Sequence, residues 1–559
     1  MKKLILSIIA CVAILCLQAQ TKSFPTAEGF GSMAQGGRGG EVVEVTTLED
    51  AATNPPEGSL RWALSQHTGK PITVVFRVSG LIKLKADLRM KRDYVTIVGQ
   101  TAPGDGICIM DAKVNFGGSR HLIVRHLRFR VGTMNGDPSG KGSIGIENAS
   151  DWIIDHCTFG WSGEENMTIY DNMRTTIQWC IIHEGLYQSG HGKGNRGYGM
   201  QWGGQNVTFH HNLIANNHNR TPRFNGARSN DHNVLIDYVN NVNYNWGKAN
   251  SSYGSDIERT SNRTNFVNNY YKPGPARPGT SSSYFTQSTV ASSQGTKVAQ
   301  WHMSGNYMEG TANTSRNANN YAGLDMGSYS ASIRNDSSLY ISREPFAITH
   351  PVAAETAHEA YISVLASAGA FPRDTVDRRI VHETRTGTAS GSGVFGTNKG
   401  IIDNPDAVGG YPEYNTYNTI TDNDKDGIDD AWELANGLDP SNPNDRNLRI
   451  GSATGYTILE AYLNSLVGEI IPFDVNSLIS SVNNPKANYD IIFGVENDQL
   501  TVSCVQSPIT NLKIYNVIGQ THTETTSPYS LNISSLPSGV YFAEAITADK
   551  FRKVLKFRR

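Results

Sequence analysis

Short apolar and β-branched runs recur through the first half of the chain, and turns rich in glycine and asparagine separate them. They begin at about Val42 and end at about Met308, with few long helical patterns in between. The clearest runs are Ile72–Val78, Val95–Val98, His121–Phe129, Trp152–Phe159, Thr175–Ile182, Asn206–Ile214, Val234–Tyr244 and Asn265–Tyr271. Short strands at such regular spacing predict a sandwich, a barrel or a solenoid of stacked coils.

An asparagine that recurs after these runs favours the solenoid. The residues, at successive separations of 29, 28 and 37, are Asn212, Asn241, Asn269 and Asn306. Cys157 and Cys180 hold the same local position in earlier runs. Because identical side chains at one corner of stacked coils can hydrogen-bond along the stack, we predict an asparagine ladder in a parallel β-helix. Chance enrichment of asparagine in turns is the alternative.

Other segments flank the repeat. The segment Gly58–Ser65 predicts a short helix that starts after Ser59 and covers the first coil. After about Pro372 the strand pattern fades into an acidic, helical stretch and then a small all-β tail. We therefore expect an all-β protein with a β-helix over 24–400, a helical segment over 415–470 and a β-sandwich-like domain over 488–559.

The N-terminus predicts export. Lys2 and Lys3 precede the apolar run Leu4–Leu17, which is too short for a typical membrane span of about 20 residues. Residues 1–19 therefore predict a signal peptide, and a short membrane anchor is the alternative. We expect a secreted or cell-surface protein with no stable membrane span.

Net charge limits the kinds of binding partner, and cysteine spacing limits the kinds of metal or redox motif. The 559 residues carry a formal net charge of −2, so we expect no nucleic acid partner, and binding of an acidic polymer needs a local basic patch. Two of the six cysteines lie in the predicted signal peptide. The other four lack the spacing typical of zinc and redox motifs.

The densest group of polar residues lies between Asp155 and Arg228. Its members are Asp155, Glu164, Glu165, His183, Glu184, His191, Lys193, Arg196, His210, His211, His218, Arg220, Arg223 and Arg228. Neighbouring coils of a β-helix lie about 4.8 Å apart, so we expect these side chains to converge on one face. Carboxylates beside cations suit β-elimination on a uronate polymer, in which Ca²⁺ bridges carboxylates and a basic group removes the C5 proton. A solvated polar face is the alternative.

Two segments, IENASDWIIDHCTF and NVTFHHNLIANNHNRTPRFNG, resemble the polysaccharide lyase family 1 pectate lyases, and the resemblance covers roughly Gly29 to Tyr307. It implies a right-handed parallel β-helix and a calcium-dependent enzyme. That enzyme would cleave (1→4)-α-D-galacturonan (polygalacturonate) by β-elimination into unsaturated oligogalacturonides. It also implies that Asp155 is a calcium ligand and that Arg220, the first arginine of RTPR, abstracts the proton.

The remaining site residues follow from the same resemblance. Glu164 and Glu165 are the nearest counterparts of the family's second acidic cluster, although the intervening loop is shorter, and they are the other expected calcium ligands. Lys193 is the expected catalytic lysine, and His191 and Arg196 are the alternatives for its contact with the substrate. The expected substrate contacts are Arg223, His191 and Arg196. Asn225 stands where the family often has a further arginine.

A second calcium site is predicted between Asp422 and Glu433. Its expected ligands, at EF-hand loop positions 1, 3, 5, 7, 9 and 12, are Asp422, Asp424, Asp426, Ile428 through its carbonyl, Asp430 and Glu433. Gly427 occupies position 6, but Asn415–Thr421 is a poor entering helix, as in half-EF-hand motifs. An acidic turn without metal is the alternative.

The C-terminal tail contains LKIYNVIGQ, ISSLPSGVYFAEA and KVLKFRR, which resemble the C-terminal sorting domain of the type IX secretion pathway in Bacteroidota. The resemblance implies passage through outer-membrane secretion machinery. An ordinary β-sandwich module is the alternative.

Two rival functions remain from the sequence. The first is a pectin lyase that acts on methyl-esterified pectin without calcium, and the predicted carboxylate ligands speak against it. The second is a non-catalytic β-helix adhesin or glycan-binding protein. A glycosidase is disfavoured because no clear acid/base carboxylate pair stands near the basic residues.

Overall fold

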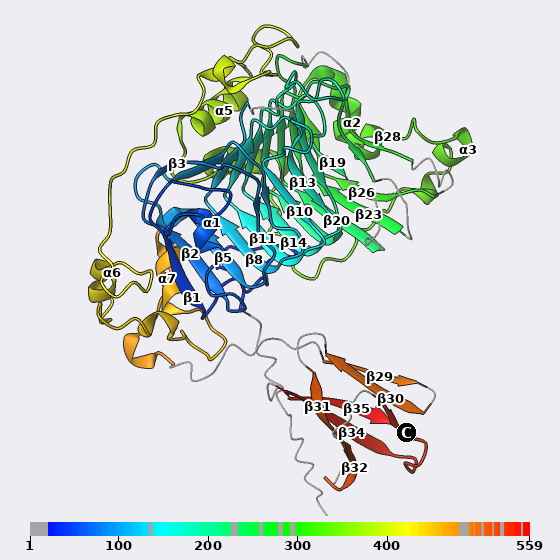
Figure 1. Cartoon of the computed structure of the whole chain (residues 1–559). Coiled ribbons are helices and arrows are strands. Elements are labelled where there is room, and N and C mark those ends of the chain that lie inside the picture. The colour runs from blue at the N-terminus through cyan, green and yellow to red at the C-terminus, as the bar shows by residue number, and fades with distance from the viewer. Residues whose placement is uncertain are drawn as a thin grey trace, which may run out of the picture. The chain divides into compact units, whose positions relative to one another are not determined.

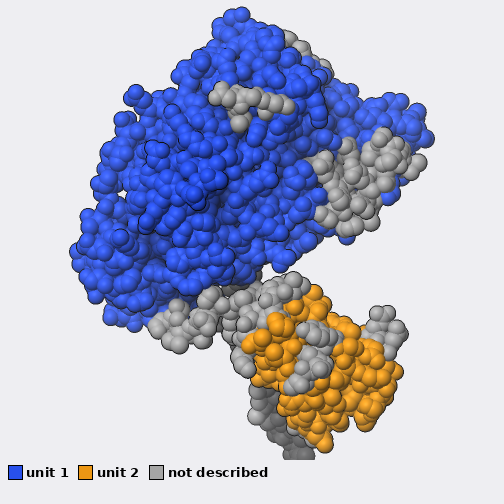
Figure 2. Space-filling view, viewed as in Figure 1, with its two compact units in different colours: residues 1–480 blue, residues 481–559 orange. Residues whose placement is uncertain are grey.

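The computed structural model describes residues 21–133, 138–224, 233–255, 261–277, 283–290, 297–479, 491–496, 498–504, 508–516, 519–525, 530–548 and 552–559. The predicted signal peptide, 1–19, lies outside the described residues. The chain divides into two compact units, residues 1–480 and 481–559 (Figure 2).

The larger unit is a right-handed parallel β-helix made of three sheets (Figure 1), as predicted. Sheet 1 contains β1 (Glu41–Val45), β2 (Ile72–Phe76), β5 (Val95–Val98), β8 (Arg120–Arg125), β11 (Ser150–Asp155), β14 (Met173–Gln178), β17 (Gln205–His210), β20 (Asn233–Val239), β23 (Ser261–Val267) and β26 (Gln300–Ser304). Each strand pairs in parallel with the equivalent strand of the next coil.

Sheets 2 and 3 complete each coil. Sheet 2 contains β3 (Gly80–Lys83), β6 (Ile107–Met110), β9 (Arg128–Arg130), β12 (Thr158–Gly160), β15 (Ile181–His183), β18 (Leu213–Ala215), β21 (Val242–Tyr244), β24 (Tyr270–Lys272) and β27 (Tyr307–Met308). Sheet 3 contains β4 (Leu88–Arg89), β7 (Val114–Asn115), β10 (Ile144–Glu147), β13 (Glu165–Tyr170), β16 (Tyr198–Trp202), β19 (Arg223–Phe224), β22 (Asn250–Gly254), β25 (Tyr284–Ser288) and β28 (Leu324–Asp325).

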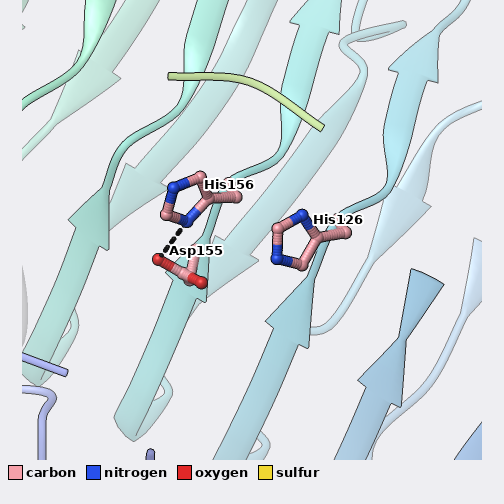
Figure 3. Close-up of side chains that lie close together, drawn as sticks. All are labelled: His126, Asp155 and His156. Atoms are coloured by element: carbon pink, nitrogen blue, oxygen red, sulfur yellow. Dashed lines mark hydrogen bonds and ion pairs between the residues drawn. The ribbon is translucent and has the colours of Figure 1, made fainter. Parts of the chain in front are cut away.

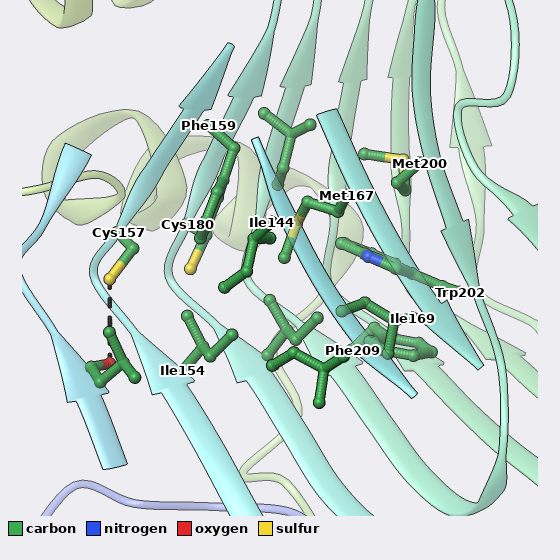
Figure 4. Packing of buried hydrophobic residues seen from close by; sticks show 14 of the residues in the cluster. Ile144, Ile154, Cys157, Phe159, Met167, Ile169, Cys180, Met200, Trp202 and Phe209 are labelled. Atoms are coloured by element: carbon green, nitrogen blue, oxygen red, sulfur yellow. Dashed lines mark hydrogen bonds between the residues drawn. The ribbon is translucent and has the colours of Figure 1, made fainter. Parts of the chain in front are cut away.

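The interior of the coils is apolar. Ile154, Phe159 and Ile169 come from the three strands of one coil and point into the same fully buried core (Figure 4). The outer face of sheet 1 is covered as well, since Ile153 packs under Phe24 of the N-terminal segment. Burial on both faces explains why these strands are continuous apolar runs rather than alternating ones.

The predicted asparagine ladder is confirmed. Asn212 donates its backbone N–H and its side-chain Nδ2 to the Asn241 Oδ1 atom, at 3.1 and 2.9 Å. Asn241 makes the same pair of bonds to Asn269, and Asn269 to Asn306. At the other end, the Cys180 N–H donates to Asn212 Oδ1 at 2.9 Å. The ladder therefore fixes the register of successive coils at one corner.

Helices cover the ends and sides of the solenoid. The predicted capping helix is α1 (Leu60–Ala63), and the Ser59 hydroxyl accepts from the Trp62 N–H at 3.3 Å. Two unpredicted helices, α4 (Ala357–Ser367) and α5 (Thr375–Thr386), lie on the outer face of sheet 2. The shorter helices α2 (Thr314–Ala318) and α3 (Ala331–Arg334) follow the last coils.

The acidic, helical stretch also packs on the β-helix. It contains α6 (Asp430–Ala435) and α7 (Ile458–Ser465), and its Ile428 and Ile458 pack against Val75 and Val98 of sheet 1. Residues 415–470 therefore lie within the larger compact unit.

The C-terminal unit is a pair of antiparallel sheets. One contains β29 (Ile491–Glu496), β30 (Gln499–Cys504) and β33 (Ser530–Asn532), and the other contains β31 (Ile509–Asn516), β32 (Thr521–Thr525), β34 (Val540–Thr547) and β35 (Arg552–Arg558). Leu500, Leu512 and Ile514 lie in the core of this unit. Across the described part of the chain, no helix is both apolar enough and long enough to span a bilayer.

Candidate functional site

The polar residues between Asp155 and Arg228 do not converge on one face. They divide among three places, because each coil contributes one strand to each of the three sheets and the residues lie at the ends of different strands. Asp155 lies at the end of β11 in sheet 1, Glu184 follows β15 in sheet 2, and Glu165 begins β13 in sheet 3. Arg228 lies outside the described residues.

Asp155 is held by its own neighbours (Figure 3). Arg125 Nε donates to one carboxylate oxygen at 2.7 Å, and His156 Nδ1 and Gln178 Nε2 each lie 2.8 Å from the other. The carboxylate is fully buried. Burial acts to raise the pKa of Asp155, but the charges of His156 and Arg125 outweigh it and hold the pKa well below its usual value.

His126, Asp155 and His156 bring three potential metal-ligand atoms within 4.8 Å of one another. These atoms also take part in bonds within the protein. His126 Nδ1 accepts from the Phe371 N–H at 3.3 Å, so the other ring nitrogen carries the proton in the neutral ring. Burial, and then His156, lower the pKa of His126 well below its usual value, which keeps the ring neutral. Asp155 already neutralises Arg125.

The structure does not bring Asp155 together with Glu164 and Glu165, the other calcium ligands expected at the same site. Asp155 lies at the carboxyl end of a sheet 1 strand, whereas Glu165 lies at the amino end of a sheet 3 strand. Both Asp155 oxygens are occupied by protein donors. Its role in this structure is to compensate the buried charge of Arg125.

His183 and Glu184 are also structural. Arg379 of α5 donates to the two Glu184 carboxylate oxygens at 2.7 and 2.9 Å, and Trp161 Nε1 donates to one of them at 3.0 Å. Both His183 and Glu184 are fully buried. This cluster attaches α5 to the β-helix.

The residues expected to act in catalysis or to contact the substrate gather with Glu164 and Glu165 at the amino edge of sheet 3, and we call these seven residues the edge cluster. Its members are Glu164, Glu165, His191, Lys193, Arg196, Arg220 and Arg223. Glu165 forms a close ion pair with Arg220 and accepts from Gln201 Nε2 at 3.1 Å. Glu165 lies directly opposite Tyr198 in the strand pairing, so β13 and β16 hold the two partners of Arg220 side by side.

Arg220 is held rigidly. Its backbone adopts φ +55°, and its N–H donates to Asn219 Oδ1 at 2.8 Å. Its guanidinium lies 4.3 Å from the centre of the Tyr198 ring. Burial is the main cause that lowers the pKa of Arg220, and nearby Arg223 lowers it further, while Tyr253 acts in the opposite direction. Arg223 itself lies over Tyr253 at 5.9 Å.

Glu164 organises the outer side of the edge cluster. It forms a close contact with His191 Nε2 and lies 3.6 Å from Arg196 Nε. Burial acts to raise the pKa of Glu164, but hydrogen bonds from Gly140 and His191 outweigh it and lower the pKa. Lys193 is exposed, and its backbone N–H donates to His191 Nδ1 at 2.9 Å.

The edge cluster does not form a calcium site on its own. Ca²⁺ takes six to eight oxygen ligands, whereas this edge offers two carboxylates that cations already neutralise. Among the described residues, no group of three closely spaced acidic, histidine or cysteine ligands includes Glu164 or Glu165. The arrangement is instead a row of cations held in place by two carboxylates, which suits binding of an anionic polymer.

The residues 422–433, which we call the acidic loop, have the donors that calcium needs. Carboxylate oxygens of Asp422, Asp424 and Asp426 lie within 4.8 Å of one another, as do those of Asp426, Glu433 and Asp445. Asp426 and Glu433 are fully buried. Burial, and then the neighbouring carboxylates, raise the pKa of Glu433 to about 8. Such crowding of buried carboxylates fits a divalent cation.

Asp430 and Ile428, two of the expected ligands, also make contacts within the protein. Asp430 accepts from the backbone and side chain of Asn423, at 2.9 and 2.5 Å. Ile428 donates its N–H to Asp426 Oδ1 at 2.9 Å, and its side chain lies in the core against sheet 1. The sequence template also missed Asp445, whose only signal is an acidic residue in the following SNPND turn.

Comparison with known proteins identifies relatives of both units. The protein named "Probable pectate lyase C" from Aspergillus flavus is 32% identical over 469 residues, which cover 82% of this chain and 98% of that protein. Its namesake from Emericella nidulans is 33% identical over 456 residues, which cover 80% of this chain and 93% of that protein. Residues 496–557 match the family described as secretion system C-terminal sorting domain, which confirms the predicted resemblance of the tail.

Solved structures give weaker likenesses. The major allergen from cedar pollen matches with a TM-score of 0.42 and 18% identity, over 62% of this chain and 92% of that chain. A pectate lyase from Bacillus sp. N165 in complex with trigalacturonate matches with a TM-score of 0.40 and 15% identity, over 61% and 98%. Likenesses at this level carry no argument about the present molecule.

Proposed function

Because this chain belongs to the family of pectate lyases and is a polysaccharide lyase, we propose that it is a secreted enzyme that cleaves (1→4)-α-D-galacturonan by β-elimination. The products would be unsaturated oligogalacturonides. The observation that carries the proposal is the partly buried Arg220, which lies between Glu165 and Tyr198 at the edge of a sheet that also presents Arg223 and Arg196.

The cations of the edge cluster would bind the substrate carboxylates. A uronate places its carboxylate next to C5, so breaking the C5–H bond develops negative charge on that carboxylate. Breaking the C4–O bond then forms the C4–C5 double bond, and the released oxygen takes up a proton from solvent water. Lys193 and Arg223 are the groups that we propose to hold the carboxylates on either side of the reacting sugar.

Arg220 is proposed to act beside C5. An arginine ordinarily keeps its proton because its pKa lies above about 12. Burial and Arg223 lower the pKa of Arg220, which increases its capacity to take a proton at C5. The same guanidinium stabilises the charge that develops on the substrate. Glu165 is proposed to position it rather than to bind a metal, and Glu164 to position His191 and Arg196 in the same way.

Calcium dependence is proposed to arise at the acidic loop. Asp422, Asp424, Asp426 and Glu433 would hold Ca²⁺, which would neutralise their buried charge and stabilise the larger unit. No chemical step is assigned to that ion.

The test is an ultraviolet assay of unsaturated product from polygalacturonate. Arg220→Lys should retain the fold, since a lysine still pairs with Glu165, and should lose at least about a hundredfold in turnover. Arg174→Lys is the matched control, because Arg174 is exposed and pairs with Asp151 on sheet 1. Near-normal turnover by Arg220→Lys would refute the catalytic role proposed for Arg220. Product from methyl-esterified pectin alone would identify a pectin lyase, and binding without product a glycan-binding protein.

Export is proposed to use the type IX pathway. The C-terminal unit would be the part that the outer-membrane machinery reads, because residues 496–557 match a sorting domain of secreted proteins. Residues 1–19 would direct the chain across the inner membrane as a signal peptide. The exported protein would be secreted or held at the cell surface.

A further inference from the structure

The acidic loop is only part of a larger group of carboxylates. The turn after α6 ends in the short helix η6 (Asp445–Asn447), which brings Asp445 to Asp426 and Glu433. We infer that Asp445 completes the calcium site as a direct ligand, that Asp430 is not one, and that the bound ion fastens this turn and the loop onto the first coils of the β-helix. This inference rests on the proposed binding of calcium by the acidic loop.

Asp445 has the environment of a metal ligand. It is 4% exposed, and its Oδ1 has no hydrogen-bond partner in the described part of the chain. Both carboxylate oxygens of the fully buried Glu433 are unpartnered in the same way, as is Asp426 Oδ2. A buried carboxylate without a partner is strongly destabilising. Four such oxygens facing one another are explained by a cation among them.

Asp430 has a different environment. Its two oxygens accept from the backbone N–H and the side-chain Nδ2 of Asn423, which lies between the first two acidic residues of the loop. These bonds close the loop without a metal. In EF-hand loops the residue at this position often reaches the ion only through water. In this protein Asp445, which lies outside the loop, supplies the carboxylate ligand that was expected from Asp430.

Both stretches that the ion would join contact the β-helix. Asp422 forms an ion pair with Arg77, which follows β2, at 2.5 Å. Arg446, next to Asp445, lies 3.3 Å from Glu41 of β1. Between them, Gly427 adopts φ +97°, and a Cβ there would lie 3.1 Å from Val42. The ion would therefore link two attachments to the first two strands of sheet 1.

The test compares two isosteric substitutions, Asp445→Asn and Asp430→Asn, in the full chain after treatment with a chelator. Calcium binding is measured by titration calorimetry, and the effect of Ca²⁺ on Tm by thermal unfolding. We expect Asp445→Asn to weaken binding at least about tenfold, because it removes one ligand charge, and to lose most of the calcium-induced rise in Tm. Asp430→Asn should change affinity by less than about threefold.

An equal or larger effect of Asp430→Asn would overturn the inference. If Glu433→Gln binds calcium as tightly as the wild-type chain, the acidic loop binds no calcium. That result would overturn the inference together with the part of the proposed function that concerns calcium. Terbium luminescence excited through Trp432, with Trp432→Phe as control, reports on this loop if a variant unfolds during calorimetry. The lyase assay on polygalacturonate tests the catalytic proposal independently of all these results.

Discussion

Replacing Asn241 by alanine removes the middle of the asparagine ladder. The Asn241 side chain accepts from the N–H and Nδ2 groups of Asn212 and donates to the carbonyls of Phe209 and Val239 and to Asn269 Oδ1. After the substitution, the buried Asn212 N–H has no acceptor. Asn212 Nδ2 keeps its bond to the Ile177 carbonyl, and Asn269 Oδ1 keeps the Asn241 N–H.

The expected loss follows from these bonds. An orphaned buried donor costs about 1–3 kcal/mol, and the two lost bonds to the Phe209 and Val239 carbonyls cost roughly 1 kcal/mol each, while Asn212 Nδ2 and Asn269 Oδ1 keep other partners. We therefore expect the free energy of unfolding to fall by about 3–5 kcal/mol. Asn335→Ala is the control, because Asn335 is exposed and such surface changes stay within about 0.5 kcal/mol.

Urea unfolding, followed through the buried tryptophans, measures both variants. Trp202 and Trp301 are fully buried in the β-helix core and report on the larger unit. A change of less than about 1 kcal/mol for Asn241→Ala would refute the reasoning. It would mean that the strand pairing holds the coils in register without the ladder.

Two further predictions concern pH and export. Burial raises the pKa of Asp237 to about 6 from 3.8, so its stabilising contribution is complete below about pH 4 and is lost as the pH rises through about 6. Asp237→Asn should therefore raise the free energy of unfolding by up to about 3 kcal/mol at pH 8 and leave it unchanged at pH 4, as measured by thermal unfolding; identical pH profiles for the two proteins would contradict this. Deletion of residues 481–559 should leave lyase activity inside the producing cells and remove it from the medium and cell surface, and undiminished export of the shortened chain would exclude a sorting role for the tail.

Much of the β-helix could be predicted because its pattern repeats from coil to coil. The asparagines recur at separations of 28 to 37 residues, and the Ser59 cap depends on a few neighbouring residues; both predictions are confirmed. The helices α4 and α5 were missed although each has a capping signal, Thr356 with Glu359 in the first case and Asp374 in the second. Both helices follow the last predicted strands, and short helices that lie against a sheet have only a weak apolar periodicity in their sequence.

The site was predicted less completely, because strand ends decide which side chains meet. Asp155 and Glu165 are close in sequence, yet a coil places them at opposite ends of strands in different sheets. Arg220 could be located because it belongs to a short motif, RTPR. Asp445 could not, since its place beside Glu433 depends on how the turn after α6 folds back.

The first strand of sheet 1 has a consequence for assembly. A stack of coils has open ends, and an exposed edge strand invites a second molecule to pair with it and extend the sheet into a fibre. β1 lies at such an end, and two of its five residues, Glu41 and Glu44, are charged. Lys70 and Arg77 hold those carboxylates in ion pairs at 3.0 and 2.6 Å. Charged side chains on an edge strand disfavour pairing with a second molecule, so this end of the β-helix disfavours growth of the sheet into a fibre.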